Sequence, residues 1–387
     1  MNNLLDKIKR IRINNQYTIM ILGLGSVGNY LLDYLVSKND ESMKVVIVGR
    51  DREKMEANVN IVTVSSLIRG LNRTEVVIES NVDFENIEQL SACIEKYEPN
   101  FIVNSSRVYS GLKYGTISWN NLRAYGIWSP LAIKYIRNIM KAVELSKKAP
   151  IVINTSYSDA VIPWLKSAGK YYPDFGSGNL NHLVPRIKFA VAKQENIKDY
   201  WNLKVVMATS HFHDVVISKE GHSEEQEQLI KVLYCDKEVN LDQTKVFNAC
   251  KIAMPTDGRR NMMNASSNYE IITTIIDAIR QKERKIFLSP GAFGEIGGYP
   301  VYIDGKDCTC GIDTEYFTLE EMQAANRRSI ALDGIENVAD GKLVYTDQLL
   351  EKIKNRFNVE LKKEIYFDEI DETAEKIIKE IIEPNVN

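Results

Sequence analysis

The stretch Tyr17-Thr18-Ile19-Met20-Ile21-Leu22-Gly23-Leu24-Gly25-Ser26-Val27-Gly28 decides the fold of this chain. A run with strand character leads directly into a Gly-x-Gly-x-x-Gly turn, and the apolar pattern of a helix follows. The first glycine permits a tight turn, the second lets the backbone approach a pyrophosphate, and the third lets the helix pack closely on the strand. The N–H groups of Ser26 and Val27 then face the anion at the helix N-terminus. The stretch therefore predicts a dinucleotide-binding βα unit.

Strand and helix patterns alternate on both sides of residue 100. The apolar strand candidates are 18–22, 44–48, 74–78, 101–104 and 151–154. A long helix is predicted to begin at Ser129-Pro130, because a serine cap followed by proline is typical of a helix start. Such alternation favours an α/β fold, with a Rossmann-type doubly wound parallel sheet covered by helices on both faces.

The pattern becomes less regular after about residue 160, and we expect an α+β catalytic domain there. Its strand candidates are 204–207, 286–288 and 299–303, with a helix over 271–280. A helical C-terminal extension follows, whose apolar stripe is expected either to pack on the core or to contact a partner. The predicted domains are an N-terminal amphipathic helix (1–16), a dinucleotide-binding Rossmann domain (17–160), a substrate or catalytic domain (161–345) and the extension (346–387).

Composition excludes several classes of function. The 387 residues carry 49 Lys plus Arg against 52 Asp plus Glu, a net charge of -3 that gives a nucleic-acid role no electrostatic support. No run of about 18 apolar residues suggests a membrane span, and the N-terminus lacks the apolar core of a signal peptide. The odd number of cysteines is typical of reduced thiols, so we expect a cytoplasmic protein.

The end of the second strand bears on cofactor choice. Sites that prefer NAD place Asp or Glu there, but this chain reads Val48-Gly49-Arg50-Asp51-Arg52. Because Arg50 and Arg52 can pair with a 2′-phosphate, the sequence favours NADP, with NAD as the alternative if Asp51 holds the ribose. Two further residues expected to contact the cofactor follow the fourth strand, namely Asn104 and Ser105.

Several segments, taken in order, resemble the lactate/malate dehydrogenase superfamily over residues 17 to about 335. The strand 151–154 runs into Thr155-Ser156 where the family has its Asn-Pro motif. The segment from Gly176-Ser177-Gly178 through Leu180-Asn181 to Arg186 is similar to the family's Leu-Asp-x-x-Arg region. Ser210-His211-Phe212-His213-Asp214 is similar to its Gly-Glu-His-Gly-Asp segment. The chain is thus identified as a divergent relative of this superfamily.

The resemblance implies hydride transfer between a nicotinamide and a 2-oxo or 2-hydroxy acid, or a related carbonyl compound. His211 or His213 would be the acid/base, and Arg186 would bind a substrate carboxylate. Asn154 would face the nicotinamide or the reacting carbonyl. Family members associate, so a homodimer or homotetramer is expected.

The chain departs from the family where the catalytic carboxylate is expected. Asn181 and His182 stand there, so either of them, or Asp214, is expected to orient the catalytic imidazole. The mobile-loop region contains Arg107 as a substrate-binding candidate, but it is rich in aromatic residues, which favours a larger or less charged substrate than lactate or malate. Arg259-Arg260 is expected either to clamp an anion or to lie on a solvated turn.

Alternative functions remain open from the sequence. The chain also has the rhythm of saccharopine-dehydrogenase-like or extended short-chain oxidoreductases, although no Tyr-x-x-x-Lys pair follows the fifth strand. Loss of the usual carboxylate would also suit a nucleotide-binding regulator without catalysis. His211 and His213 form a His-x-His pair that could hold a metal with His182 or a carboxylate, but we expect no metal. The NAD- and metal-dependent glycosidase branch of the family is a weaker alternative, since it would need a Cys/His metal pair that the sequence does not place.

Overall fold

A six-stranded parallel sheet forms one half of the molecule. The computed structural model describes residues 4–13, 16–70, 73–109 and 111–386. The strands of this sheet are β1 (Tyr17–Leu22), β2 (Met43–Val48), β3 (Glu75–Glu79), β4 (Phe101–Asn104), β5 (Ile151–Asn154) and β6 (Phe175–Gly176). Their order is β3-β2-β1-β4-β5-β6, and every neighbouring pair is parallel. This is the Rossmann order, so the predicted fold class is confirmed.

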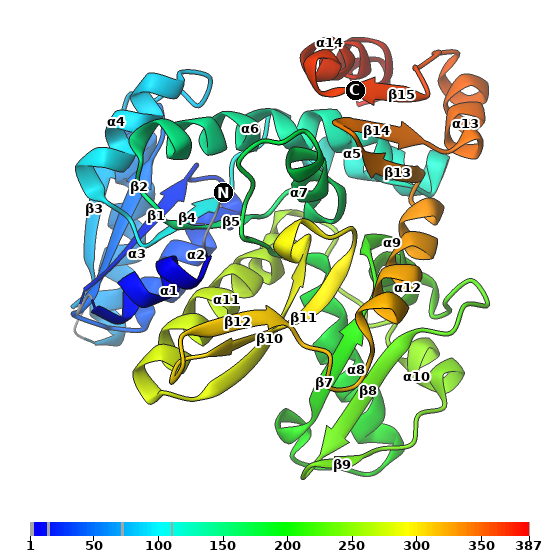
Figure 1. Ribbon diagram of the computed structural model, residues 1–387, viewed down its shortest axis with the longest axis horizontal. Helices are drawn as coiled ribbons and strands as arrows, with labels where there is room; N and C mark the ends of the chain where they lie inside the picture. The colour runs from blue at the N-terminus through cyan, green and yellow to red at the C-terminus, as the bar shows by residue number, and fades with distance from the viewer. Residues whose placement is uncertain (1–3, 14–15, 71–72, 110, 387) are drawn as a thin grey trace.

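Helices cover both faces of this sheet (Figure 1). They are α1 (Leu4–Ile13), α2 (Ser26–Ser37), α3 (Arg52–Arg69), α4 (Ile87–Tyr97), α6 (Ser129–Ser146), α7 (Ser158–Ser167) and α11 (Asn261–Gln281). Alternate residues of β1 enter different cores, because successive strand side chains point to opposite faces. Met20 and Leu22 join a core with α4 and α6, whereas Ile19 and Ile21 join one with α1, α2 and α11.

Three small antiparallel sheets lie in the second half, among further helices (Figure 1). Their strands are β7 (Lys204–Ala208), β8 (Leu229–Tyr234), β9 (Lys237–Glu238), β10 (Arg284–Pro290), β11 (Gly298–Asp304), β12 (Thr309–Ile312), β13 (Ile335–Ala339), β14 (Lys342–Tyr345) and β15 (Glu364–Tyr366). The remaining helices are α5 (Gly111–Ile117), α8 (Asn179–Gln194), α9 (His211–Glu220), α10 (Gln243–Ala249), α12 (Leu319–Leu332), α13 (Asp347–Phe357) and α14 (Ile370–Ile377).

Two sheets cross the predicted domain limits. The parallel sheet continues beyond residue 160, because β6 pairs with β5. The sheet of β13, β14 and β15 crosses residue 346, because β15 pairs with β14. The C-terminal segment therefore contains a strand as well as helices, and the division of the chain into domains stays a prediction.

The apolar stripe of the C-terminal segment is used within the chain. Ile370, Ala374 and Ile377 of α14 are buried in the same core as α6. Arg137 of α6 also donates to Asp371, with Nη2 3.0 Å from Oδ2. Of the two expectations for this stripe, packing on the core is the one that the structure shows.

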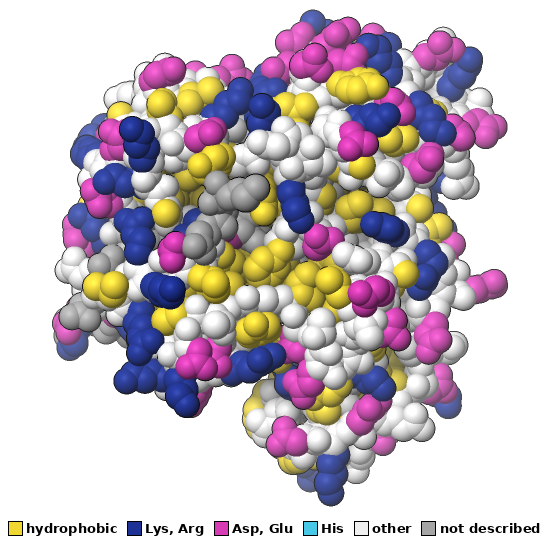
Figure 2. All heavy atoms as spheres, in the orientation of Figure 1, with side chains coloured by type: hydrophobic (Ala, Val, Ile, Leu, Met, Phe, Trp, Pro, Cys, Tyr) yellow, Lys and Arg dark blue, Asp and Glu magenta, His cyan; other side chains and the backbone are white. Residues whose placement is uncertain are grey.

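The surface carries mixed charge. Figure 2 shows Lys, Arg, Asp and Glu side chains interspersed over one face, with hydrophobic side chains gathered near its centre. None of the helices in the described ranges combines the length and the apolar character needed to cross a membrane.

A buried ion pair fastens α1 to the parallel sheet. Lys7 Nζ lies 2.6 Å from Asp174 Oδ2, and the two side chains are only 3% and 2% exposed. The same carboxylate oxygen accepts the N–H of Val152 in β5 at 2.8 Å. Asp174 thus needs Lys7, because an unpaired buried carboxylate is strongly destabilising.

We therefore expect Lys7→Met to lower the free energy of unfolding by about 3–5 kcal/mol. Adding Asp174→Asn should recover most of this loss, since the amide oxygen can still accept the N–H of Val152. Urea unfolding followed by circular dichroism measures both variants. Lys9→Met is the control, because Lys9 is 60% exposed. Equal stability of the Lys7 and Lys9 variants would contradict the assigned role.

Candidate active site

One cleft of about 1080 Å³ joins the glycine turn to the second half of the molecule. On one side it is lined by the turn after β1 and the end of β2. On the other side it is lined by α8, α9 and the start of α11. Its lining includes Gly23, Gly25, Ser26, Val27, Arg50, Ser105, Arg107, Trp119, Tyr125, Tyr157, His182, Arg186, His211, Asp214, Ser218, Lys219 and Arg260. A cleft of this size can hold a dinucleotide and a small substrate.

The glycine turn has the geometry that a pyrophosphate requires. Gly23 has φ +90, and a Cβ on Gly28 would lie only 2.3 Å from Gly23 O. Gly25 has open space where its Cβ would stand, and it precedes α2 without any side-chain cap. Ser105 Oγ donates to Gly23 O at 2.6 Å and holds the turn. The backbone therefore leaves room for an anion at the start of α2.

The residues after β2 take different roles. Asp51 caps α3, because its Oδ1 accepts the N–H of Lys54 at 3.0 Å. Arg52 pairs with Glu56 at 2.7 Å and does not line the cleft. Arg50 lines the cleft, and its guanidinium has no hydrogen bond or ion pair to any described residue. Arg50 is thus a cation available to a ligand at this end, where Lys54 also lines the cleft.

Two predicted contacts lie beneath the cleft rather than in its wall. Asn104 Nδ2 donates to Asn154 Oδ1 at 2.9 Å, and both side chains are buried. Asn154 Nδ2 in turn donates to Ser156 O at 2.9 Å. The pair links the ends of β4 and β5, so it supports the site from below.

His211 is held by a carboxylate from a distant part of the chain. Its Nδ1 lies 2.8 Å from Asp333 Oδ2, at the end of α12. The side chain of Asp333 is completely buried. It also accepts the Tyr157 hydroxyl at 2.8 Å and the Tyr125 N–H at 2.7 Å. Nδ1 is thereby committed to Asp333, which leaves Nε2 for a ligand.

The surroundings of His211 favour its charged form. Burial opposes an imidazolium, but the Asp333 carboxylate outweighs it and raises the pKa of His211. The rings of Tyr125 and Tyr157 stand edge-on to the imidazole, at 4.6 and 5.4 Å between centroids. The carboxylate and the two aromatic rings thus fix the orientation of the imidazole and favour its protonated form, from which Nε2 can give a proton to a substrate.

His213 faces away from the cleft. Its Nδ1 lies 2.6 Å from Ser329 Oγ and its Nε2 lies 3.2 Å from Ser223 O. Burial lowers its pKa to about 4. Residues two apart on a helix point in different directions, so His211 and His213 cannot chelate one metal.

The other polar candidates on α8 and α9 do not orient His211. Asp214 lines the cleft, and burial raises its pKa to about 7. His182 also lines it, and burial lowers its pKa to about 3. Asn181 donates to Glu270 Oε2 at 2.5 Å. The partner of the imidazole is thus Asp333, which the sequence analysis missed because nothing local marks it.

The two arginine candidates for substrate binding both reach the cleft. Arg186 is buried, and its Nη1 donates to Cys250 O at 2.9 Å. Its Nη2 lies 3.1 Å from Met254 Sδ, whereas its Nε is buried without a hydrogen-bond partner among the described residues. Arg107 lines the cleft beside the glycine turn.

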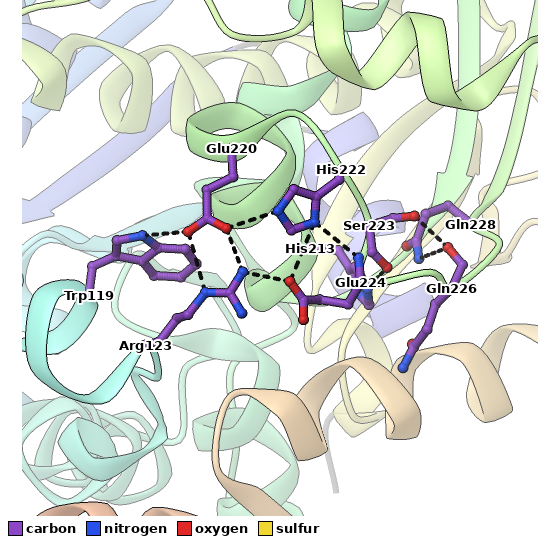
Figure 3. Close-up of polar contacts among 9 residues, drawn as sticks. All are labelled: Trp119, Arg123, His213, Glu220, His222, Ser223, Glu224, Gln226 and Gln228. Atoms are coloured by element: carbon purple, nitrogen blue, oxygen red, sulfur yellow. Dashed lines mark hydrogen bonds and ion pairs between the residues drawn. The ribbon is translucent and has the colours of Figure 1, made fainter.

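A second polar cluster lies at the end of α9 (Figure 3). Glu220, His222 and Glu224 bring three possible metal-ligand atoms within 4.8 Å of one another. However, Arg123 Nη2 lies 2.5 Å from both Glu220 Oε2 and Glu224 Oε1. The guanidinium supplies the positive charge that a metal ion would bring, so the cluster is an ion-pair network.

The fold is similar to those of known dehydrogenases. Residues 19–114 match the saccharopine dehydrogenase NADP binding domain family. Cryptosporidium parvum lactate dehydrogenase with lactic acid and nicotinamide adenine dinucleotide has 12% identity and a TM-score of 0.55, covering 82% of this chain and 97% of that one. Cryptosporidium parvum malate dehydrogenase has 13% identity and a TM-score of 0.52, covering 81% and 96%. The search of curated proteins found no match.

At such low identity the solved structures establish the fold alone. The family match covers only the first part of the chain, and it falls on β1, the glycine turn and the segment through β4. Together with the geometry of the turn, these comparisons support an NAD(P)-binding Rossmann oxidoreductase.

The buried Asp214 gives a pH-dependent prediction for stability. In the unfolded chain this group ionises near 3.8, whereas in the folded protein its pKa is about 7. Folding therefore takes up a proton between about pH 4 and pH 7, and the stability contributed by this group falls as pH rises. The melting temperature of Asp214→Asn should equal that of the parent protein at pH 4. At pH 8 it should be higher than that of the parent by roughly 3 °C or more.

Thermal unfolding followed by circular dichroism across this pH range measures the difference. The control is Asp236→Asn, because Asp236 is exposed and should give no pH-dependent difference. If the difference in melting temperature between Asp214→Asn and the parent became smaller as pH rises, the raised pKa assigned to Asp214 would be contradicted.

Proposed function

We propose that the chain is an NAD(P)-dependent dehydrogenase or reductase that interconverts a hydroxyl and a carbonyl group. The observation that carries this proposal is the single cleft shared by the glycine turn and His211. A bound nicotinamide dinucleotide would supply or accept the hydride. The substrate class favoured by the lactate/malate dehydrogenase fold is a 2-oxo or 2-hydroxy acid, or a related carbonyl compound.

The cofactor would be held by the turn after β1 and by residues beyond β2. The N–H groups at the start of α2 suit the pyrophosphate, and Ser105 keeps the turn in place. Arg50 suits a 2′-phosphate, while Asp51 is engaged in capping α3. The proposed cofactor is therefore NADP.

His211 would move the proton. With Nδ1–H donated to Asp333, the ring can carry a second proton on Nε2 and give it to the oxygen of a carbonyl being reduced. The same atom would take the proton back during oxidation of the hydroxyl. Asp333 stabilises the charged ring and sets its tautomer, and Tyr157 fixes the carboxylate.

The match to the saccharopine dehydrogenase NADP binding domain favours a second candidate, an oxidoreductase of that type. Both candidates use the same cofactor end of the cleft. The His211–Asp333 pair favours the first, because it provides an acid/base for a hydroxyl proton.

Removal of the Asp333 charge should impair turnover. We expect Asp333→Asn to lower kcat by about 100-fold in NADPH-dependent reduction of the best 2-oxo acid from a screen. Activity in the reducing direction should fall as pH rises through the pKa of His211, and the variant should show this fall at lower pH. NADPH affinity should stay within about twofold of the parent value, and His213→Asn, away from the cleft, is the control. Unchanged turnover in Asp333→Asn would refute the proton-transfer assignment.

Cofactor preference should depend on Arg50. We expect Arg50→Gln to weaken NADPH binding by about tenfold, which corresponds to one charge-assisted hydrogen bond, and to leave NADH binding unchanged. Fluorescence titration with both nucleotides measures this. Arg52→Gln is the matched control, because Arg52 pairs with Glu56 outside the cleft wall. Equal losses for NADPH and NADH would place Arg50 away from the 2′-phosphate.

A further inference from the structure

One side of α9 presents a row of polar groups to the cleft. The residues of this helix that line the cleft are His211, Asp214, Val215, Ser218 and Lys219. Their spacing is that of one helix face. Lys219 lies eight residues after His211, which corresponds to about 12 Å along the helix axis. The cleft wall therefore extends well beyond the group that would move the proton.

The middle of this row has unsatisfied polar atoms. Four cleft-lining atoms of the described residues are buried without a hydrogen-bond partner: Asp214 Oδ1 and Ser218 Oγ on α9, and His182 Nε2 and Arg186 Nε on α8. Buried polar atoms normally have partners, so unpaired atoms in a cleft wall indicate ligand groups that bind there.

The cleft opposite this row carries a positive charge without a carboxylate partner, close to Asp214 as well as to Lys219. Arg260, at the start of α11, is half-buried and lines the cleft, and it makes no side-chain hydrogen bond or ion pair within the described ranges. Its neighbour Arg259 is exposed and pairs with Asp257 at 2.6 Å. Arg260 also lies close enough to Lys219 to lower the pKa of that amine, behind the larger effect of burial.

Glu220, which follows Lys219 on α9, belongs to the polar network drawn in Figure 3. Both oxygens of the adjacent Glu220 are occupied, since Oε1 accepts from Trp119 Nε1 at 3.1 Å and Oε2 from Arg123 Nη2 at 2.5 Å. Lys219 Nζ instead lies 5.0 Å from the centroid of the Trp119 ring, on the cleft wall. Lys219 makes no ion pair with Glu220 within the described ranges, although the nearby carboxylate favours the protonated amine.

We propose that Lys219 and Arg260 form a distal subsite for an anionic group, and that the substrate is an extended polar molecule lying along α9. Its reacting carbon lies at His211, its hydroxyl or amine groups lie along Asp214 and Ser218, and its far end carries a carboxylate or a phosphate. The proposal rests on the oxidoreductase function for the position of the reacting carbon. It makes the substrate longer than lactate or malate.

Binding of simple probes to the full chain tests the subsite without turnover. Isothermal titration would compare suberate, an eight-carbon dicarboxylate, with the shorter succinate and with octanoate, which has only one carboxylate. We expect suberate to bind at least tenfold more tightly than either. Lys219→Gln and Arg260→Gln should each weaken suberate binding about tenfold and change octanoate binding less than twofold. Arg259→Gln is the matched control and should bind all three as the parent does.

The outcomes separate this proposal from the proposed function. Equal binding of suberate and succinate, no suberate binding, or suberate binding unaffected by both substitutions would overturn the subsite. Loss of NADPH binding with unchanged suberate binding in Arg260→Gln would also overturn it, because Arg260 would then serve the cofactor. The expected suberate pattern in a chain that binds neither NADPH nor NADH would support the subsite and refute the oxidoreductase function. Addition of inorganic phosphate as a competitor of suberate distinguishes a phosphate-binding end from a carboxylate-binding one.

Discussion

The buried carboxylate of Asp333 is the constraint on which the site depends. A carboxylate without solvent must have its oxygens hydrogen-bonded, or it destabilises the fold by several kcal/mol. Here the partners come from three places in the chain, namely the backbone of Tyr125, the hydroxyl of Tyr157 and the ring of His211. Satisfying one buried charge thus brings the segment before α6, the start of α7 and the start of α9 together around one imidazole.

This constraint also explains how the two ends of the cleft are related. The glycine turn is positioned by β1, whose side chains are buried in cores on both faces of the sheet. His211 begins a helix outside that sheet, but its backbone N–H donates to Asp159 in α7, which directly follows β5. The sheet therefore positions the proposed cofactor end of the cleft directly, and it positions His211 through α7.

The sequence predicted those features of the fold and site that are determined by residues close together in the chain. Strand alternation and the glycine spacing act within a few residues, so the Rossmann sheet and the turn could be predicted from residues 17–28 and the strands that follow. The partner of His211 could not, because Asp333 lies 122 residues away and precedes Gly334 in what resembles an ordinary helix end. The choice between His211 and His213 also needed the structure, since both follow the same strand and only the helix geometry separates them.

Helix α9 shows how one regular element can determine both the chemistry and the reach of a site. Its period turns His211, Asp214 and Ser218 toward the cleft and His213 toward Ser329. At its end, Glu220 is bound by Trp119 and Arg123, and the preceding Lys219 lines the cleft without an ion pair to a described carboxylate. Arg186 has its terminal nitrogens on Cys250 and Met254, whereas Arg260 has no such partner in the described part of the chain. Lys219 lies about 12 Å from His211 along α9, farther than a short 2-hydroxy acid extends, and this separation is the physical basis for a longer substrate.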